Sequence, residues 1–259
     1  MCRDDVGAVH RWELVVTVAE SGSVKILDAQ AREHAQPRRT DVPTVLDTTE
    51  LRWCFPGPLP SGVRSWFADS TGVAEQRFDT YLLEGRSDIG VKRRFREMLE
   101  LKVRQSLDGW IELSEGLAGS PEVWRKWSPA EGLVDGDSEG RWVDVHKSIV
   151  KRRFSDDGTE IAFSSDLQVT GAGCDVEVVE VTVGAVQAWM FAFAAFGPPA
   201  TRRGALLASW RGLVAATSCP EPFELRTGRA MSYPEWLALT ISSDPAECGG
   251  RRDSAARSR

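Results

Sequence analysis

The segment 98–107, MLELKVRQSL, alternates apolar and charged side chains without interruption. One parity holds Leu99, Leu101 and Val103, and the other holds Glu100, Lys102 and Arg104. Because the side chains of a β-strand point alternately to the two faces of a sheet, this pattern predicts a strand with one apolar and one charged face. The fold must therefore cover the apolar face and accommodate acids and bases side by side on the other.

Other segments of the chain repeat the pattern. The residues that share a charged face are Glu50 and Arg52; Glu75, Arg77, Asp79 and Tyr81; Lys92 and Arg94; and Asp175 and Glu177. A flat sheet would show these faces to water, where cross-strand ion pairs would form. A sheet curled into a barrel would line its lumen with them instead. The repetition over consecutive strands favours the barrel.

The chain divides into expected strands and helices separated by turn residues. Strands are expected at 44–55, 75–83, 87–95, 97–106, 141–154, 159–169 and 174–183, and helices at 61–70, 120–128, 185–197, 202–217 and 232–242. Most connections between strands are too short for crossovers, which favours antiparallel pairing. We therefore predict an α+β fold, an antiparallel eight-stranded β-barrel (a tunnel) with flanking helices. We expect it to occupy residues 43–242, after an N-terminal extension at 1–42, possibly partly ordered, and before a disordered tail at 243–259.

The composition limits the partners that this chain can have. A net charge of −6 argues against a general affinity for nucleic acid or for an anionic membrane. We find no apolar run long enough to span a bilayer and no signal-peptide pattern, so we expect a cytoplasmic protein without membrane or nucleic-acid partners. The five cysteines are dispersed, which is typical of reduced thiols, and their spacing defines no metal cluster. The oligomeric state stays open.

The chain resembles the CYTH family, the triphosphate tunnel metalloenzymes, in the order of the segments ELRW, PGPLPSGVRSWF, EQRFDTYLLEG, DIGVKRR, LELKVR, VWRKWS, VDVHKSIVKRRF, CDVEVVEV and FAFAAFG. The resemblance covers roughly residues 45–200 and is one of pattern and spacing. It implies an eight-stranded antiparallel tunnel that binds a polyphosphate-bearing ligand and a divalent metal. Family members begin with an E-x-E-x-K run, and here Arg52 stands in place of the second acid and Cys54 in place of the lysine. Hydrolysis of a triphosphate therefore does not follow from the resemblance alone.

Candidate site residues follow from the charged faces and from this resemblance. The expected phosphate-binding residues are Arg52, Arg77, Lys92, Arg94, Lys102, Arg104, Lys147 and Arg152. The expected metal ligands are Glu50, Glu100, Asp175 and Glu177, which would hold Mg²⁺ or Mn²⁺. His146 is a candidate general acid or base, with a structural role as the alternative.

These residues lead to a functional hypothesis with two alternatives. The protein would bind an anionic small molecule, one bearing a di- or triphosphate, together with Mg²⁺. It would act on the phosphate group as a hydrolase or as a diphosphate-eliminating lyase or cyclase. The first alternative is a phosphate-ligand binding protein that has lost the metal site, because Arg52 can mimic a metal's charge. The second is a β-barrel enzyme of secondary metabolism with an uncharged substrate, which would require an aromatic rather than a charged lumen.

Overall fold

A computed structural model of the chain describes residues 17–18, 24–25, 44–68, 72–83, 85–94, 98–128, 141–163, 171–216 and 228–242. The predicted extension at 1–42 lies outside the described residues except for a two-stranded pairing of β1 (Thr17–Val18) with β2 (Val24–Lys25). The predicted disordered tail at 243–259 lies outside them entirely.

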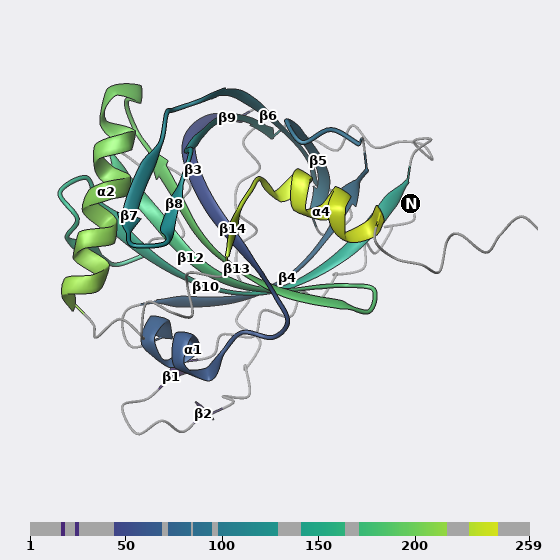
Figure 1. The fold of residues 1–259 in the computed structure, drawn as a ribbon, viewed down its shortest axis with the longest axis horizontal. Helices are drawn as coiled ribbons and strands as arrows, with labels where there is room; N and C mark the ends of the chain where they lie inside the picture. The colour runs from purple at the N-terminus through teal and green to yellow at the C-terminus, as the bar shows by residue number, and fades with distance from the viewer. Residues whose placement is uncertain are drawn as a thin grey trace, which may run out of the picture.

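Eight antiparallel strands close into a barrel (Figure 1). They are β3 (Thr44–Pro56), β4 (Val73–Leu82), β5 (Ile89–Arg94), β6 (Met98–Leu107), β9 (Glu122–Ser128), β10 (Trp142–Ser155), β12 (Gly173–Val183) and β13 (Val186–Phe196). Around the barrel the order is β10-β12-β13-β3-β9-β6-β5-β4, and the β4–β10 pairing closes it. The predicted fold class is therefore confirmed.

The pairing register fixes which side chains face the lumen. Glu100 is the Cα partner of Lys92, and Lys102 is the partner of Lys126, so these residues lie on one face of the sheet. Residues of the opposite parity, such as Trp53 and Phe191, point outward and are fully buried beneath the elements that cover the barrel. The alternation seen in the sequence thus separates a charged lumen from an apolar outer core.

The outer core lies under two helices and a hairpin. These elements are α1 (Ser61–Ala68), α2 (Pro199–Ala216) and the pair β7 (Ile111–Ser114) and β8 (Leu117–Gly119). Trp53, Phe191 and Phe193 form a ring cluster with Trp210 of α2, at centroid distances of 5.0 to 6.4 Å. Burying aromatic side chains on this scale is a major source of stability, at about 1.5–3 kcal/mol for each one that is fully buried.

Helix α2 lies against the turn that connects β10 to β11 (Glu160–Ile161). Gly158 of this turn has a φ of +88°, and a Cβ added to it would collide with the backbone of Ala208. A Cβ on Gly212 would collide in turn with the carbonyl of Gly158. Two glycines therefore permit backbone-to-backbone packing between the helix and the turn.

One end of the barrel is occupied by the short strand β14 (Arg229–Ala230) and the helix α4 (Tyr233–Ser242). β14 pairs with the last residues of β3, beyond the point where β9 ends its pairing with that strand. Tyr233, Trp236 and Leu237 are buried in an inner core with Tyr81 and Met190. The ribbon shows α4 lying across this end of the barrel (Figure 1).

Two expected helices are strands. Residues 120–128 form β9, and residues 185–197 contain β13. In β13 the large residues Trp189, Phe191 and Phe193 point to the outer core, whereas Ala188, Ala192 and Ala194 lie on the lumen parity. Most of the alanines that suggested a helix therefore belong to the lumen face of a strand. The expected strand at 159–169 is reduced to β11, and residues 164–170 lie outside the described part of the chain.

Candidate ligand-binding site

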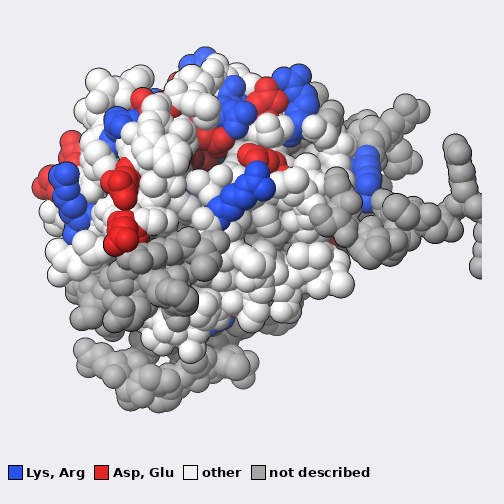
Figure 2. Space-filling view, in the orientation of Figure 1, with Lys and Arg blue, Asp and Glu red and all other residues white. Residues whose placement is uncertain are grey.

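The lumen of the barrel is lined by charged side chains of both signs. Its basic residues are Arg52, Arg77, Lys92, Arg94, Lys102, Arg104, Lys126, Lys147, Lys151 and Arg153. Its acidic residues are Glu50, Glu75, Asp79, Glu100, Glu122, Asp175 and Glu177. Among the residues that the structure describes, ten bases and seven acids thus line the lumen, although the whole chain carries a net charge of −6. In the space-filling view, basic and acidic side chains lie side by side on the face that is shown (Figure 2).

On the wall formed by β5, β6 and β9, the basic side chains are more exposed than the acidic side chains that they contact. We call this set of bases the cationic wall; it consists of Lys92, Arg94, Lys102, Arg104 and Lys126. The side chains of Glu50 and Glu100 below it are only 8% and 7% exposed, whereas the cationic wall is 17–30% exposed. The wetted surface on this side of the lumen is therefore mainly positive.

Glu100 is the centre of an ion-pair network within the cationic wall. Its carboxylate lies 2.8 Å from Lys92 Nζ, 3.3 Å from Arg94 Nη2 and 3.5 Å from Lys126 Nζ. Burial opposes ionisation of this acid, but the three cations outweigh burial and hold the pKa of Glu100 far below its usual range. One carboxylate therefore fixes three cations that converge on the lumen.

A second cluster surrounds Asp79, whose side chain is fully buried. Lys147 Nζ lies 3.0 Å from Asp79 Oδ2 and 2.6 Å from the hydroxyl of Tyr81, and Lys92 Nζ lies 3.5 Å from the same Asp79 oxygen. Burial and the charge of Lys92 lower the pKa of Lys147 well below its usual value. Burial and the charge of Arg94 lower the pKa of Lys92 to about 8. Strongly shifted pKa values among grouped ionisable residues are a common feature of functional sites.

The opposite wall, on β4, β10 and β12, has the reverse layering. Lys151 Nζ lies between Glu75 and Glu177, at 3.2 and 3.4 Å from their carboxylates. Glu75 and Glu177 are 33% and 26% exposed, more than the 14% of Lys151. Burial opposes ionisation of Glu177, but Lys151 and Arg77 outweigh it and lower its pKa to about 2. In the lumen, the mainly positive surface on β5, β6 and β9 therefore lies opposite a more negative surface on β4, β10 and β12.

The four expected metal ligands all face the lumen, but basic side chains bind each of them. Lys102 bonds both carboxylate oxygens of Glu50, at 2.5 and 2.6 Å, and Arg52 lies 3.6 Å away. Arg153 bonds Asp175. Within the described ranges, no three His, Cys, Asp or Glu side chains gather as a set of metal ligands. Each of these carboxylates is thus paired with Lys or Arg in the arrangement described, and we derive no chemical step through a metal.

Two expected site residues lie outside the lumen. Arg152 points to the outer core, where its fully buried side chain bonds Glu160 through two nitrogens and contacts the rings of Phe67 and Phe154. His146 is exposed on the outer surface and stacks on Phe78 at 4.4 Å. The prediction placed Lys147, His146 and Arg152 of β10 in one site. In an extended strand, however, alternate residues point to opposite faces, and only the residues in register with Lys147 face the lumen.

The remaining expected phosphate-binding residues, including Arg52, Arg77 and Lys147, are brought together in the lumen. The sequence analysis missed Lys126 and Glu122, because their segment was expected to be a helix. It also missed Lys151 and Arg153, whose parity marks them as lumen residues once β10 is known to have Lys147 inside.

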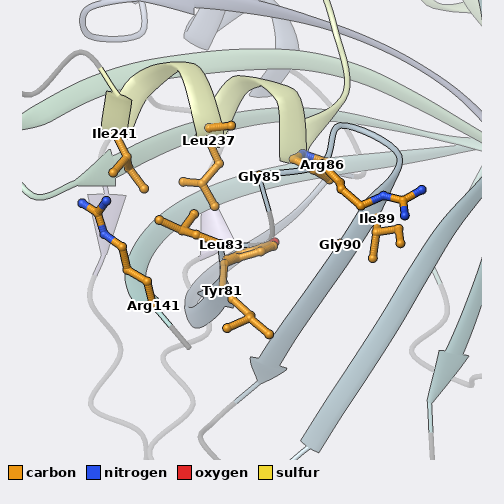
Figure 3. A pocket seen from close by; sticks show the side chains of 12 residues that line it. Tyr81, Leu83, Gly85, Arg86, Ile89, Gly90, Arg141, Leu237 and Ile241 are labelled. Atoms are coloured by element: carbon orange, nitrogen blue, oxygen red, sulfur yellow. The ribbon is translucent and has the colours of Figure 1, made fainter. Parts of the chain in front are cut away.

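Two cavities adjoin the helix-covered end of the barrel. An apolar groove of about 240 Å³ lies between α4 and strands β4 and β5, where Leu237 and Ile241 point toward Tyr81 and Leu83 (Figure 3). A second cavity of about 260 Å³ lies beside β14, and Arg52, Arg104, Glu122 and the exposed Trp110 contribute to its lining. The second cavity contains lumen residues and thus connects the charged interior with the surface.

Comparison with protein-family models, with curated proteins and with solved structures gave no match to this chain. Among the helices that the structure describes, none has the length and the apolar run needed to cross a bilayer.

Proposed function

We propose that the barrel binds a small molecule that carries two or three linked phosphate groups, and that its cationic wall holds their oxygens. The observation that carries the proposal is the layering of charge on β5, β6 and β9. There, deeply buried carboxylates hold five bases in place, and the bases form the more exposed surface. Lys and Arg side chains at fixed spacing are the groups that proteins use to bind phosphate oxygens.

The wider resemblance to the triphosphate tunnel metalloenzymes supports the same ligand class. We further propose that the protein acts on the phosphate group of this ligand and requires Mg²⁺ to do so. Because each lumen carboxylate expected to bind metal is held by Lys or Arg, Mg²⁺ would arrive bound to the ligand's own phosphates. This chain departs from the family pattern at Arg52 and Cys54, and the departure at Arg52 fits this arrangement. There, a fixed cation stands where family members have an acidic metal ligand.

The test is isothermal titration with inorganic tripolyphosphate and pyrophosphate, each with and without Mg²⁺. Lys126→Gln removes one member of the cationic wall. Arg125→Gln is its matched control. Arg125 directly precedes Lys126 on β9, but its side chain lies on the outer face, where it bonds Asp47. Loss of one charged hydrogen bond to phosphate, worth about 1.5–3 kcal/mol, should weaken binding at least tenfold in Lys126→Gln and leave Arg125→Gln unchanged. Equal affinities in the two variants would contradict the proposal.

A phosphate-release assay on the same samples separates binding from catalysis. Release that depends on Mg²⁺ and is lost in Lys126→Gln would support a hydrolase or a diphosphate-eliminating enzyme. Tight binding without release would support a non-catalytic binding protein.

A further inference from the structure

Three buried atoms in the inner part of the barrel have no hydrogen-bond partner among the described residues. They are Asp79 Oδ1, Arg94 Nε and the hydroxyl oxygen of Tyr233. Buried polar groups in folded proteins are nearly always hydrogen-bonded, because water satisfies them in the unfolded chain. Three such atoms in one region are unused hydrogen-bonding capacity inside the barrel.

The three atoms belong to one connected cluster. Arg94 Nε lies 3.8 Å from Asp79 Oδ1, and the other oxygen of Asp79 accepts a hydrogen bond from Lys147 at 3.0 Å. Lys147 Nζ lies 4.3 Å from the centre of the Tyr233 ring, and the guanidinium carbon of Arg52 lies 5.7 Å from it. Tyr233 is therefore surrounded by the same cations that the proposed function assigns to phosphate.

Tyr233 differs from its stacked neighbour Tyr81 in one respect. Their ring centres are 4.9 Å apart and both side chains are buried. The hydroxyl of Tyr81 bonds Lys147 at 2.6 Å, whereas the hydroxyl of Tyr233 has no partner in the described part of the protein. Burial raises the pKa of Tyr233 well above its usual value, so this hydroxyl stays protonated and can donate. A phenylalanine would fill the same space, so the hydroxyl serves no packing purpose.

The docking of α4 fixes this hydroxyl in position. Ser232 caps the helix by accepting a hydrogen bond from the Glu235 amide, and its hydroxyl donates to the carbonyl of Ser87. The amide of Met231 bonds the carbonyl of Arg52 on β3. The two residues that precede Tyr233 are thus tied to β3 and to the segment before β5.

We propose that Tyr233 is a ligand-binding residue, whose hydroxyl donates a hydrogen bond to a phosphate oxygen of the ligand in the lumen. This inference rests on the proposed function and extends it, because it assigns to α4 a direct part in recognition. The ligand's phosphate would then contact Tyr233 together with Arg52 and Lys147, at the end of the lumen that α4 covers.

The test compares Tyr233→Phe with Tyr81→Phe, by titration with inorganic tripolyphosphate and by thermal melting. Tyr233→Phe should weaken binding roughly tenfold, the value of one hydrogen bond to an anion, while its melting temperature stays equal or rises. Tyr81→Phe should melt at a lower temperature, because it removes a partner of Lys147.

Each other outcome is decisive. Unchanged affinity in Tyr233→Phe would overturn the inference alone and would point to an internal water as the acceptor. A lowered melting temperature in Tyr233→Phe would also overturn it, since the hydroxyl would then have a partner within the protein. If the wild-type protein binds neither tripolyphosphate nor pyrophosphate, the proposed function itself fails, and the inference fails with it.

Discussion

Lys102 and Glu50 meet across the lumen wall, where the lysine ammonium bonds both carboxylate oxygens at 2.5 and 2.6 Å. The two residues lie on β6 and β3, which do not pair with each other, because β9 lies between them. Their contact therefore spans a whole strand. It ties the first barrel strand to the cationic wall and holds Lys102 in a fixed place on the lumen surface.

Glu50→Gln should lower stability and raise anion affinity at the same time. The variant removes the negative partner of Lys102 and Arg52, and breaking a buried pair costs up to about 3–5 kcal/mol, less here because Lys102 is 30% exposed. The two cations are then free to bind phosphate more strongly. Urea unfolding and tripolyphosphate titration measure the two effects. Weaker binding that appears only with Mg²⁺ would show instead that Glu50 holds a metal.

Lys92 should add a contribution to the stability of the ligand-free protein that grows between about pH 8 and pH 10.5. Burial and Arg94 lower the pKa of Lys92 to about 8 in the folded state, against 10.5 when exposed. In this range the unfolded chain binds more protons than the folded protein, so stability increases with pH by at most about 1.4 kcal/mol per unit from this group. Below pH 8 both states carry the proton and the contribution to the slope disappears.

Urea unfolding of the wild type and of Lys92→Met over this pH range tests the assignment. The difference between the two slopes isolates Lys92 from other titrating groups. Parallel slopes would show that Lys92 titrates normally in the folded protein.

Arg152→Met should destabilise the fold and leave ligand binding intact. Arg152 is buried in the outer core and bonds Glu160 through two nitrogens, so its loss removes both hydrogen bonds from a partly buried carboxylate at a cost of about 1–3 kcal/mol. Unfolding by urea gives the first effect, and tripolyphosphate titration gives the second. A large loss of affinity in folded Arg152→Met would contradict this and show that Arg152 takes part in ligand binding.

Gly158→Ala should be among the most damaging small substitutions in the chain. The residue has a φ of +88°, and its new methyl group would collide with the backbone of Ala208 in α2. Strain at this position together with displacement of the helix should cost more than about 3 kcal/mol. Gly184→Ala is the control, because Gly184 also has a positive φ, of 56°, but no atom within contact distance of an added Cβ. Thermal melting of both variants is the measurement. Gly184→Ala reports the cost of the positive φ alone, and the larger loss expected in Gly158→Ala reports the added collision with α2.

Much of the barrel could be predicted from the sequence, because lumen and outer core require opposite residue types on alternate positions. Leu99 to Arg104 show this clearly, and so do the charged residues of β4. The prediction was wrong for β13, where alternation is between Ala and aromatic residues such as Phe191 and Phe193. Both are apolar, so the period of two is visible only in side-chain size.

The site was predictable only in part, for two physical reasons. Arg152 is charged yet faces the outer core, because Glu160 from the following short strand neutralises it there. Tyr233 reaches the inner core through the docking of α4, which depends on backbone contacts with residues far away in the chain, such as Arg52. Neither a counter-charge on another strand nor a distant docking contact leaves a periodic signal.

The closure of the barrel also has a consequence for how the chain folds as it is synthesised. β3 pairs with β13, and β4 pairs with β10, so the first barrel strands have partners that emerge from the ribosome only much later. Such distant pairings slow folding, because a long loop must close before the contacts form. In the nascent chain β3 and β4 therefore keep one edge unpaired until most of the protein has been made, although β9 and β5 can pair with their other edges earlier. The dense charge of the future lumen would keep these waiting strands apart, since exposed edges rich in Lys and Arg resist pairing with other chains.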